Sequence, residues 1–423
     1  MVDRSIIRCP VCHSNIMVRT QIGFLPEHPI RIHCGKCGIL IKGTFFQDEV
    51  NPQFSITYEN AEKIGCDSKI DYCIEVSGEF LTEKIKKYDH ENDFIKLSPF
   101  MKAVANTQED IEDFQMDFLE FQSFLKKEWP QFRQMNDLWL SDKHQYLKDL
   151  LRPFLPKTQF PLNNDLELLR GLHVLQIRWF NPIFRGKYFD IISKKMFEGI
   201  QEIINNDMIK YFDLISFFAD NKMLDNFERD IFKIIHAFIR NFKYFIITLS
   251  LEYYSNIPNL EIEGTATVTF DDVKHFFQDC FECIGELAPL AIAYNNVKIH
   301  SSFREMSEPP DPSLSKVKAI DDLLKQSKSN RLKFCLSDEL FNQIIELNYS
   351  SELRNVIGHL ECFQYDGASQ RITYYPSCTI GKGEKKSIYL VEFLCLALKQ
   401  FKTVLLLNEL VYQTKKMHFA IQG

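Results

Sequence analysis

Residues 222–254, KMLDNFERDIFKIIHAFIRNFKYFIITLSLEYY, form the stretch that decides the fold class most clearly. Apolar side chains recur in it at intervals of three and four, as at Leu224, Phe227, Ile231 and Phe238. This period places them along one face of an α-helix, and such a face is buried against other elements. The stretch therefore predicts a long amphipathic helix inside a helical core.

Three more segments share this period and are joined by short connections, which is typical of a helical bundle. They are Asp165–Phe180, Tyr188–Ala219 and Phe270–Tyr294. Proline-rich stretches at 153–161 and 308–312 bound the bundle, which we place at residues 153–312. Before it, a capping box at Thr107–Asp110 is expected to open a helix that runs to Trp129, where Pro130 interrupts it.

The N-terminus carries Cys9-Pro-Val-Cys12 and Cys34-Gly-Lys-Cys37, a C-x2-C-x21-C-x2-C pattern. Two thiolates three residues apart on a tight turn can face one ion, and a second such turn completes a tetrahedron. We therefore predict that Cys9, Cys12, Cys34 and Cys37 bind Zn²⁺. Four protein ligands leave no position for water, so this zinc is expected to be structural. The alternative interpretation is four buried free thiols.

Short β-like runs surround these cysteines and favour a zinc ribbon over residues 1–50. They are Ile16–Thr20, Ile30–His33 and Ile39–Phe46. Residues 51–152 are interpreted as a connecting region of mixed strand and helix, with its clearest strand pattern at Ile70–Val76. Two further cysteine pairs lack a matching partner pair, so they are expected to be free thiols: Cys66 with Cys73, and Cys280 with Cys283.

Composition narrows the class of protein. The chain has 423 residues, 45% hydrophobic and 25% charged, with a net charge of −7. Residues 1–45 carry +4 and residues 351–423 carry +3, so the middle is strongly acidic. A protein whose whole surface binds nucleic acid is thereby excluded. No apolar run reaches the ~20 residues that span a bilayer, and no signal peptide is visible. We expect a cytoplasmic protein with reduced cysteines and no membrane association.

The C-terminal part, residues 313–423, contains the stretch Glu352–His359, which places Arg354, Asn355 and His359 within six positions. Ser337 is expected to open a helix toward Tyr349, and Ser350 and Ser351 to cap the helix that carries Arg354. After it the sequence predicts a strand over 371–375, a turn at 381–383 and a return strand over 386–390. A closing helix is expected over 391–417.

These three side chains suit RNA cleavage without a metal. An imidazole with a pKa near ~6.5 can take or give a proton at neutral pH. In RNA the 2′-hydroxyl is an internal nucleophile, and an arginine can stabilise the charge that develops on the attacked phosphate. Asn355 can donate to phosphate or orient the His359 ring. The expected product is a 2′,3′-cyclic phosphate, and DNA is expected to resist.

The spacing alone is not specific, because Arg8 with His13 and Arg229 with His236 also match it. The first of these lies in the cysteine turn and is incidental. The second also has a polar residue after its arginine, and a separation of seven places both side chains on one helix face. It remains a second candidate. A purely structural role for Arg354 and His359, at a helix end, is the other alternative.

The pattern Arg354-Asn355-x3-His359 resembles the R-x4-6-H signature of HEPN-domain ribonucleases. The continuation Tyr365-Asp366-Gly367, with the strand after it, is similar to zinc-ribbon proteins of this type in bacterial abortive infection and phage defence. The resemblance implies a mainly α (α+β) fold: a zinc ribbon, a large helical bundle and a C-terminal HEPN-like helical domain with a β-hairpin.

This resemblance also implies an RNA substrate, a homodimer whose two motifs form a composite active site, and a role as a toxin or antiviral-defence effector. Catalysis would rest on Arg354, Asn355 and His359. The competing hypothesis belongs to another class: a non-catalytic zinc-ribbon module that binds nucleic acid or protein and carries a degenerate HEPN bundle.

Overall fold

A computed structural model describes residues 1–48, 53–65, 68–94, 96–107, 110–185, 188–309, 311–335, 350–358, 362–377 and 383–422. The chain is 57% helical with several small sheets, which confirms the predicted mainly α class. It forms two compact units. The first unit comprises residues 1–115, 240–277 and 352–398, and the second comprises 116–239, 278–351 and 399–423. Sequence analysis expected four successive segments; of these only 1–50 lies wholly in one unit.

Two β-sheets form the N-terminal part of the first unit. A five-stranded sheet has the order β6-β1-β2-β7-β9, in which β2 and β7 are parallel and the other neighbours antiparallel. Its strands are β1 (Val2–Arg8), β2 (Asn15–Gln21), β6 (Glu62–Ile64), β7 (Tyr72–Val76) and β9 (Lys86–Lys87). An antiparallel three-stranded sheet contains β3 (Glu27–His33), β4 (Leu40–Gln47) and β5 (Phe54–Tyr58). The strands expected around the cysteines are confirmed.

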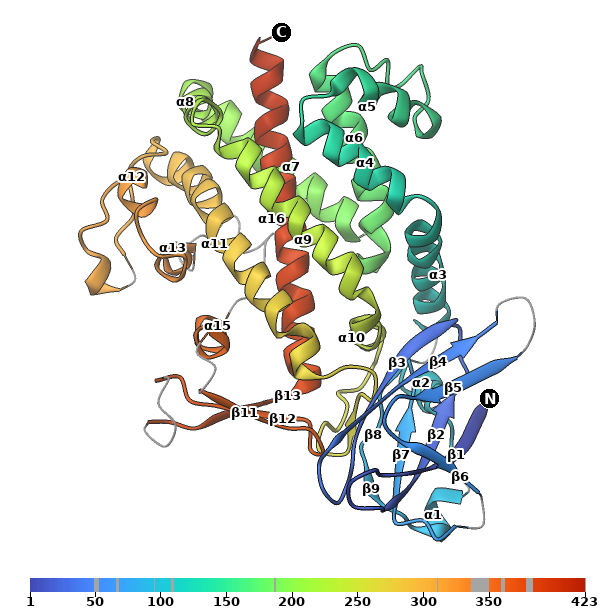
Figure 1. Cartoon of the computed structure of the whole chain (residues 1–423). Helices are drawn as coiled ribbons and strands as arrows, with labels where there is room; N and C mark the ends of the chain where they lie inside the picture. The colour runs from blue at the N-terminus through green and yellow to red at the C-terminus, as the bar shows by residue number, and fades with distance from the viewer. Residues whose placement is uncertain are drawn as a thin grey trace. The chain divides into compact units, whose positions relative to one another are not determined.

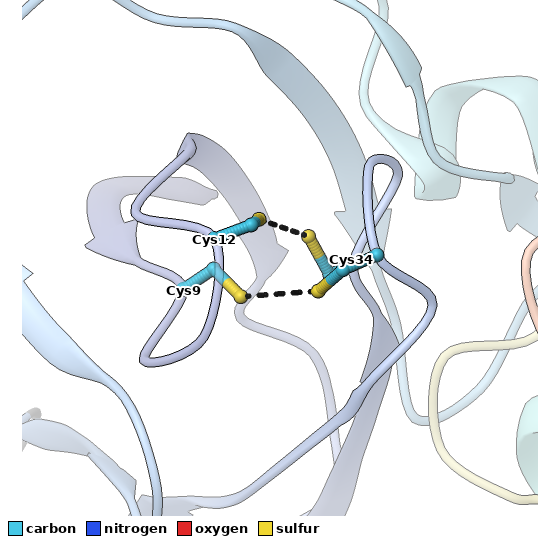
Figure 2. A group of neighbouring side chains, drawn as sticks. Cys9, Cys12 and Cys34 are labelled. Carbon is cyan, nitrogen blue, oxygen red and sulfur yellow. Dashed lines mark hydrogen bonds between the residues drawn. The ribbon is translucent and has the colours of Figure 1, made fainter.

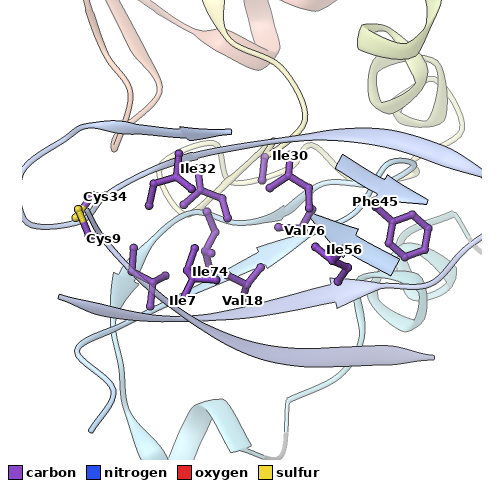
Figure 3. Packing of buried hydrophobic residues seen from close by; sticks show 13 residues of the cluster. Ile7, Cys9, Val18, Ile30, Ile32, Cys34, Phe45, Ile56, Ile74 and Val76 are labelled. Carbon is purple, nitrogen blue, oxygen red and sulfur yellow. The ribbon is translucent and has the colours of Figure 1, made fainter. Parts of the chain in front are cut away.

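One apolar core lies between these two sheets (Figure 3). The five-stranded sheet contributes Ile7, Ile16, Val18, Ile74 and Val76, and the three-stranded sheet contributes Ile30, Ile32, Ile41, Phe45 and Ile56. Each fully buried branched side chain of this kind contributes roughly 1.5–3 kcal/mol. The first 50 residues therefore share their core with strands from the following segment, because β7 pairs with β2 and β5 with β4.

The remainder of the first unit holds two smaller sheets and short helices. A three-stranded antiparallel sheet contains β11 (Phe363–Asp366), β12 (Arg371–Tyr374) and β13 (Lys386–Tyr389), so the predicted strand pair is confirmed and gains a strand. The other elements are β8 (Thr82–Glu83) paired with β10 (Glu263–Gly264), α1 (His90–Phe94), α2 (Pro99–Thr107), α10 (Ile246–Leu251) and α15 (Ser351–Gly358). Thr107 ends α2, where its hydroxyl donates to the Ala103 carbonyl at 2.9 Å, and residues 108 and 109 of the predicted capping box lie outside the described residues.

Helices make up the second unit, and Figure 1 shows their arrangement. The unit contains the whole of α4 (Trp129–Leu140), α5 (His144–Leu151), α6 (Asp165–Phe180), α7 (Tyr188–Asn206), α8 (Met208–Asp220), α12 (Ile320–Leu323) and α13 (Lys328–Cys335). It also contains most of α3 (Ile111–Lys127), α9 (Met223–Asn241), α11 (Phe270–His300) and α16 (Leu390–Gln422). The predicted helix 188–219 breaks at Asp207, whose carboxylate caps α8 by accepting from the Lys210 amide. The helix predicted over 222–254 ends at Asn241, and α10 follows a 3-10 turn.

Aromatic side chains fill the helical core of the second unit. Phe124 stacks on Trp179 with ring centres 5.2 Å apart, and Phe238 stacks on Phe401 at 3.9 Å.

Cys280 and Cys283 are buried free thiols on α11, as expected.

Among the described helices, none combines the length and the apolar character that crossing a bilayer requires. Several predicted features lie outside the described residues: the helix from Ser337, Cys66 and His359. Of the predicted turn at 381–383, the structure describes only Gly383.

Candidate metal centre and Arg354 motif

The two cysteine turns have the same backbone geometry. In each, the amide of the first cysteine donates to the carbonyl five residues later, and its own carbonyl accepts from the amide four residues later. The distances are 2.9 and 3.1 Å in the turn after β1 (Cys9 to Ser14, His13 to Cys9) and 2.9 and 2.9 Å in the turn after β3 (Cys34 to Ile39, Gly38 to Cys34). The pattern folds each C-x2-C pair so that both sulfurs face one side.

Both turns need a left-handed residue at the fourth position after the first cysteine. Gly38 supplies it with a φ of 74°, where glycine meets no steric penalty. His13 adopts a φ of 59° at the equivalent place in the first turn. Gly35 serves another purpose, because a Cβ there would overlap the ring of Tyr72. The sequence alone did not indicate a left-handed histidine in the first turn.

The four sulfurs converge. Cys9 Sγ lies 3.6 Å from Cys37 Sγ, Cys12 Sγ lies 3.5 Å from Cys34 Sγ, and all four are within 4.8 Å of one another. Figure 2 shows Cys9 and Cys12 on one turn, with Cys34 facing them from the other. Zinc–sulfur bonds of ~2.3 Å in a tetrahedron place the sulfurs about 3.8 Å apart. The quartet is therefore compatible with one metal ion, and no second such group occurs among the described residues.

The position of the quartet explains what an ion would stabilise. Cys9 and Cys12 belong to the β1–β2 turn of one sheet, and Cys34 and Cys37 belong to the β3–β4 turn of the other. In Figure 3 the sulfurs of Cys9 and Cys34 lie at one end of the core between the sheets. An ion here would link the two sheets, and the cysteines that the structure describes are free thiols.

The surroundings of the quartet shift the pKa values of Cys9 and Cys12 in opposite directions. Burial raises the pKa of the Cys9 thiol to about 12. At Cys12 burial also acts to raise the pKa, but hydrogen bonds from the side chain and backbone of Ser14 outweigh it and lower the pKa to about 6. Cys37 is exposed, whereas Cys9 and Cys34 are buried.

Two of the three residues of the predicted catalytic motif lie on α15. Leu353, Val356 and Ile357 are buried and anchor this helix, which leaves Arg354 and Asn355 half-buried on its other side. Arg354 Nη1 donates to Asn355 Oδ1 at 3.3 Å. His359 lies outside the described residues, so its position relative to the pair stays a prediction.

The segment after the motif contacts the second cysteine turn, within the first unit. The ring of Tyr365 on β11 meets the ring of His33 edge-on, with centres 5.8 Å apart. Gly367 lies so close to His33 that a Cβ would overlap its ring. His33 Nδ1 is 3.1 Å from the Gly38 carbonyl. Sequence reasoning missed this contact, because more than 300 residues separate its two sides and neither carries a local signal for it.

Arg229 and His236, the second Arg–His match, contact different residues. Both lie on α9, as their spacing predicts. Arg229 is exposed and donates to the Leu140 carbonyl at 3.4 Å, whereas the ring centre of His236 is 6.1 Å from that of Trp129. Nothing in this geometry favours the pair over Arg354 and Asn355.

A polar cavity of about 220 Å³ in the second unit was not predicted. Lys415 Nζ donates to Asp225 at 2.7 Å and to Glu228 at 2.6 Å, and Trp139 Nε1 donates to Glu228 at 3.1 Å. Burial raises the pKa of Glu228 although Lys415 opposes the shift. His144 stacks on Trp139 at 4.7 Å. Each of these polar groups is already paired within the protein, which indicates a structural ion cluster.

Comparison of the chain with protein-family models, with curated proteins and with solved structures finds no match. The cysteine quartet and the Arg354 motif are therefore the two features that point to a function.

Proposed function

We propose that this protein is a metal-independent endoribonuclease that uses Arg354, Asn355 and His359 and carries a structural Zn²⁺ on Cys9, Cys12, Cys34 and Cys37. The observation that carries the proposal is the Arg354–Asn355 pair. Its two side chains are hydrogen-bonded to each other, half-buried, and held on the solvent side of a helix whose other face is anchored. A preformed arginine–amide pair on a rigid element is suited to hold a phosphate.

In the proposed reaction His359 removes the proton from the 2′-hydroxyl of RNA. The oxygen then attacks the adjacent phosphorus and the bond from phosphorus to the 5′-oxygen of the next nucleotide breaks. That oxygen takes a proton from a protonated imidazole or from water. Arg354 stabilises the charge on the non-bridging oxygens, and its planar guanidinium can bind two of them at once. Asn355 has one amide oxygen engaged by Arg354, so its NH2 group remains to contact phosphate or His359.

The proposed zinc takes no part in this reaction. Four thiolates would fill its coordination sphere, and its chemistry when bound is to hold the two sheets together. The sulfur separations of 3.5 and 3.6 Å support zinc, and they also suit a four-sulfur iron site. Metal analysis of the purified protein distinguishes the two. We expect about one zinc per chain.

The biological setting follows from the resemblance to HEPN-domain proteins alone. On that basis we propose that the C-terminal residues form a HEPN-like domain and that two copies of the chain pair their motifs in a homodimer. The same resemblance supports a toxin or antiviral-defence role. Arg354 lies in the same compact unit as the cysteine quartet, which supports a ribbon that contacts the RNA presented to the motif.

RNA cleavage in the absence of free divalent ions tests the proposal. Wild type, Arg354→Ala and His359→Ala would be incubated with mixed RNA in EDTA, after metal analysis has shown that the bound metal is retained. We expect wild type to cleave and to leave 2′,3′-cyclic phosphate ends, and both variants to lose at least 100-fold in rate. The matched control is Arg229→Ala with His236→Ala, the other Arg–His pair of this chain, which should cleave like wild type.

Equal cleavage by wild type and His359→Ala would contradict the proposed active site. RNA that is bound but not cut by wild type would favour the second hypothesis, a non-catalytic zinc-ribbon module with a degenerate HEPN bundle. A substrate carrying a single ribonucleotide within DNA adds a chemical check, because cleavage should occur only after that ribonucleotide.

A further inference from the structure

Two sulfur pairs of the quartet, Cys12–Cys34 at 3.5 Å and Cys9–Cys37 at 3.6 Å, have different surroundings. Ser14 Oγ lies 3.0 Å from Cys12 Sγ and 3.4 Å from Cys34 Sγ, and Ser14 is only 5% exposed. One buried hydroxyl therefore bridges one sulfur from each turn. The equivalent position of the second turn is Ile39, which has no side-chain donor. The described contacts give the Cys9–Cys37 pair no such hydroxyl.

This difference matters because only thiolates are strong nucleophiles. A sulfur that has lost its proton can only accept a hydrogen bond, so beside a metal-bound quartet the Ser14 hydroxyl must be the donor. A hydrogen bond donated to a thiolate withdraws charge from the sulfur and lowers its reactivity. The single hydroxyl hydrogen of Ser14 is shared between Cys12 at 3.0 Å and Cys34 at 3.4 Å. Cys34 is also buried, with 1% of its surface exposed.

Solvent exposure indicates that the Cys9–Cys37 pair is the more reactive one. Cys37 is exposed, whereas Cys9, whose sulfur lies 3.6 Å from that of Cys37, has no exposed surface. An oxidant from solvent therefore reaches Cys37 first, and the sulfur 3.6 Å away is in place to respond. Reactive thiols are those that combine thiolate character with access and a resolving cysteine close by.

We propose that Cys37 is the oxidant-reactive thiol of this chain, and that peroxides convert Cys37 and Cys9 to a disulfide while Ser14 shields Cys12 and Cys34. The proposal rests on the metal-binding half of the proposed function and is independent of RNA cleavage. The Cys37 sulfur attacks one peroxide oxygen and the O–O bond breaks, which gives a sulfenic acid and one water. The Cys9 sulfur then displaces the hydroxyl as a second water. Two thiols lose two electrons and two protons, and the peroxide takes up both.

Such a disulfide removes two of the four ligands. Two remaining thiolates do not hold a tetrahedral ion, so the metal leaves. The quartet would then act as an oxidation sensor that unlinks the two sheets of the first unit, and a thiol reductant with added metal would restore it.

Peptide mapping after mild oxidation tests the proposal. The metal-bound full-length protein would be treated with hydrogen peroxide at less than one equivalent, its remaining thiols alkylated, and its disulfides located by mass spectrometry. A zinc-sensitive dye would follow metal release in parallel. We expect Cys9–Cys37 as the first disulfide, with one zinc released for each disulfide formed. A first disulfide between any other two of the four cysteines overturns the proposal.

Ser14→Ala tests the role of the hydroxyl. It should expose Cys12 and Cys34 to oxidation and add a Cys12–Cys34 disulfide to the products, and it should speed zinc transfer to a chelator by about 10-fold. Ser14→Thr keeps a hydroxyl and should restore the wild-type products. Ser5→Ala is the matched control, because it removes a β1 hydroxyl that faces Tyr58 at 3.5 Å instead of the quartet. An unchanged product distribution in Ser14→Ala contradicts the shielding role.

A different result separates this proposal from the metal assignment. If the purified protein contains no bound metal and takes none up, the metal-binding half of the proposed function fails. Where metal analysis does find the ion, timed alkylation of the metal-bound protein decides which thiol is most reactive. Cys37 should react first, and a faster reaction at Cys12 would overturn the proposal while the metal assignment holds.

Discussion

Glu79 shows how much one buried carboxylate can matter to the first unit. It is 2% exposed, and one of its oxygens accepts from the backbone amides of Phe24 and of Leu25, the latter at 2.9 Å. Gln21 Nε2 donates to the other oxygen at 3.3 Å. Gly23 permits this approach, because a Cβ there would overlap the carboxylate. The side chain fixes the loop between β2 and β3, on which the second cysteine turn depends.

Burial raises the pKa of Glu79 to about 7, which predicts a stability that falls with pH. Because this value lies above the unfolded value, the folded state binds the proton more tightly. The stabilisation is complete below about pH 4 and is lost as pH rises through about 7, by an amount on the order of 3 kcal/mol. Glu79→Gln should flatten this dependence. Urea unfolding at pH 5 and pH 8 measures it, with the exposed Glu59→Gln as control, which should keep the wild-type slope.

The contact between the β11–β12 turn and the second cysteine turn predicts an effect at the scale of elements. Gly367→Ala would place a Cβ in the space of the His33 ring, and the overpacking should cost about 1–3 kcal/mol. Gly65→Ala is the matched control, because its Cβ would meet no atom within 4 Å and should change stability by less than about 0.5 kcal/mol. Thermal unfolding of both variants compares them. Equal stabilities would show that the two turns do not pack together.

The ion cluster between α9 and α16 gives a second test at this scale. Lys415→Met would leave Glu228 buried without its cation, and we expect a loss of about 3–5 kcal/mol. Adding Glu228→Gln removes the uncompensated charge and should recover most of that loss. Denaturant unfolding of the two single variants and the double variant gives the coupling. Strictly additive losses would contradict the described ion pair.

At the scale of the whole molecule, metal removal should act on the sheets and not on the helices. The quartet links the β1–β2 turn to the β3–β4 turn, whereas the helical core of the second unit contains none of its ligands. Chelation, or Cys34→Ser, should therefore greatly increase amide exchange over residues 2–47 and leave most of the helical circular dichroism in place. Exchange that stays unchanged after confirmed metal loss would show that the apolar core alone holds the sheets together.

Sequence by itself determined the features that short-range chemistry specifies. The cysteine spacing identified all four candidate ligands, because each pair needs only a turn of known length to bring its sulfurs together. The three-and-four period located α6 to the residue, since an amphipathic face is a local property. The start of α15 at Ser351 and the pairing of β12 with β13 were also within reach, because both depend on residues close in the chain.

Only the tertiary structure decided the contacts between residues that are distant in sequence. The parallel pairing of β2 with β7 joins the first 50 residues to the next segment. His33 packs on Gly367, and Lys415 finds Glu228 on another helix. Nothing in the local pattern of either partner specifies such a contact, because each is chosen by the packing of a whole core. Ser14 is a further example. In sequence it is an ordinary turn serine, and its contact with Cys34 Sγ at 3.4 Å exists only because the second sheet places that sulfur beside it.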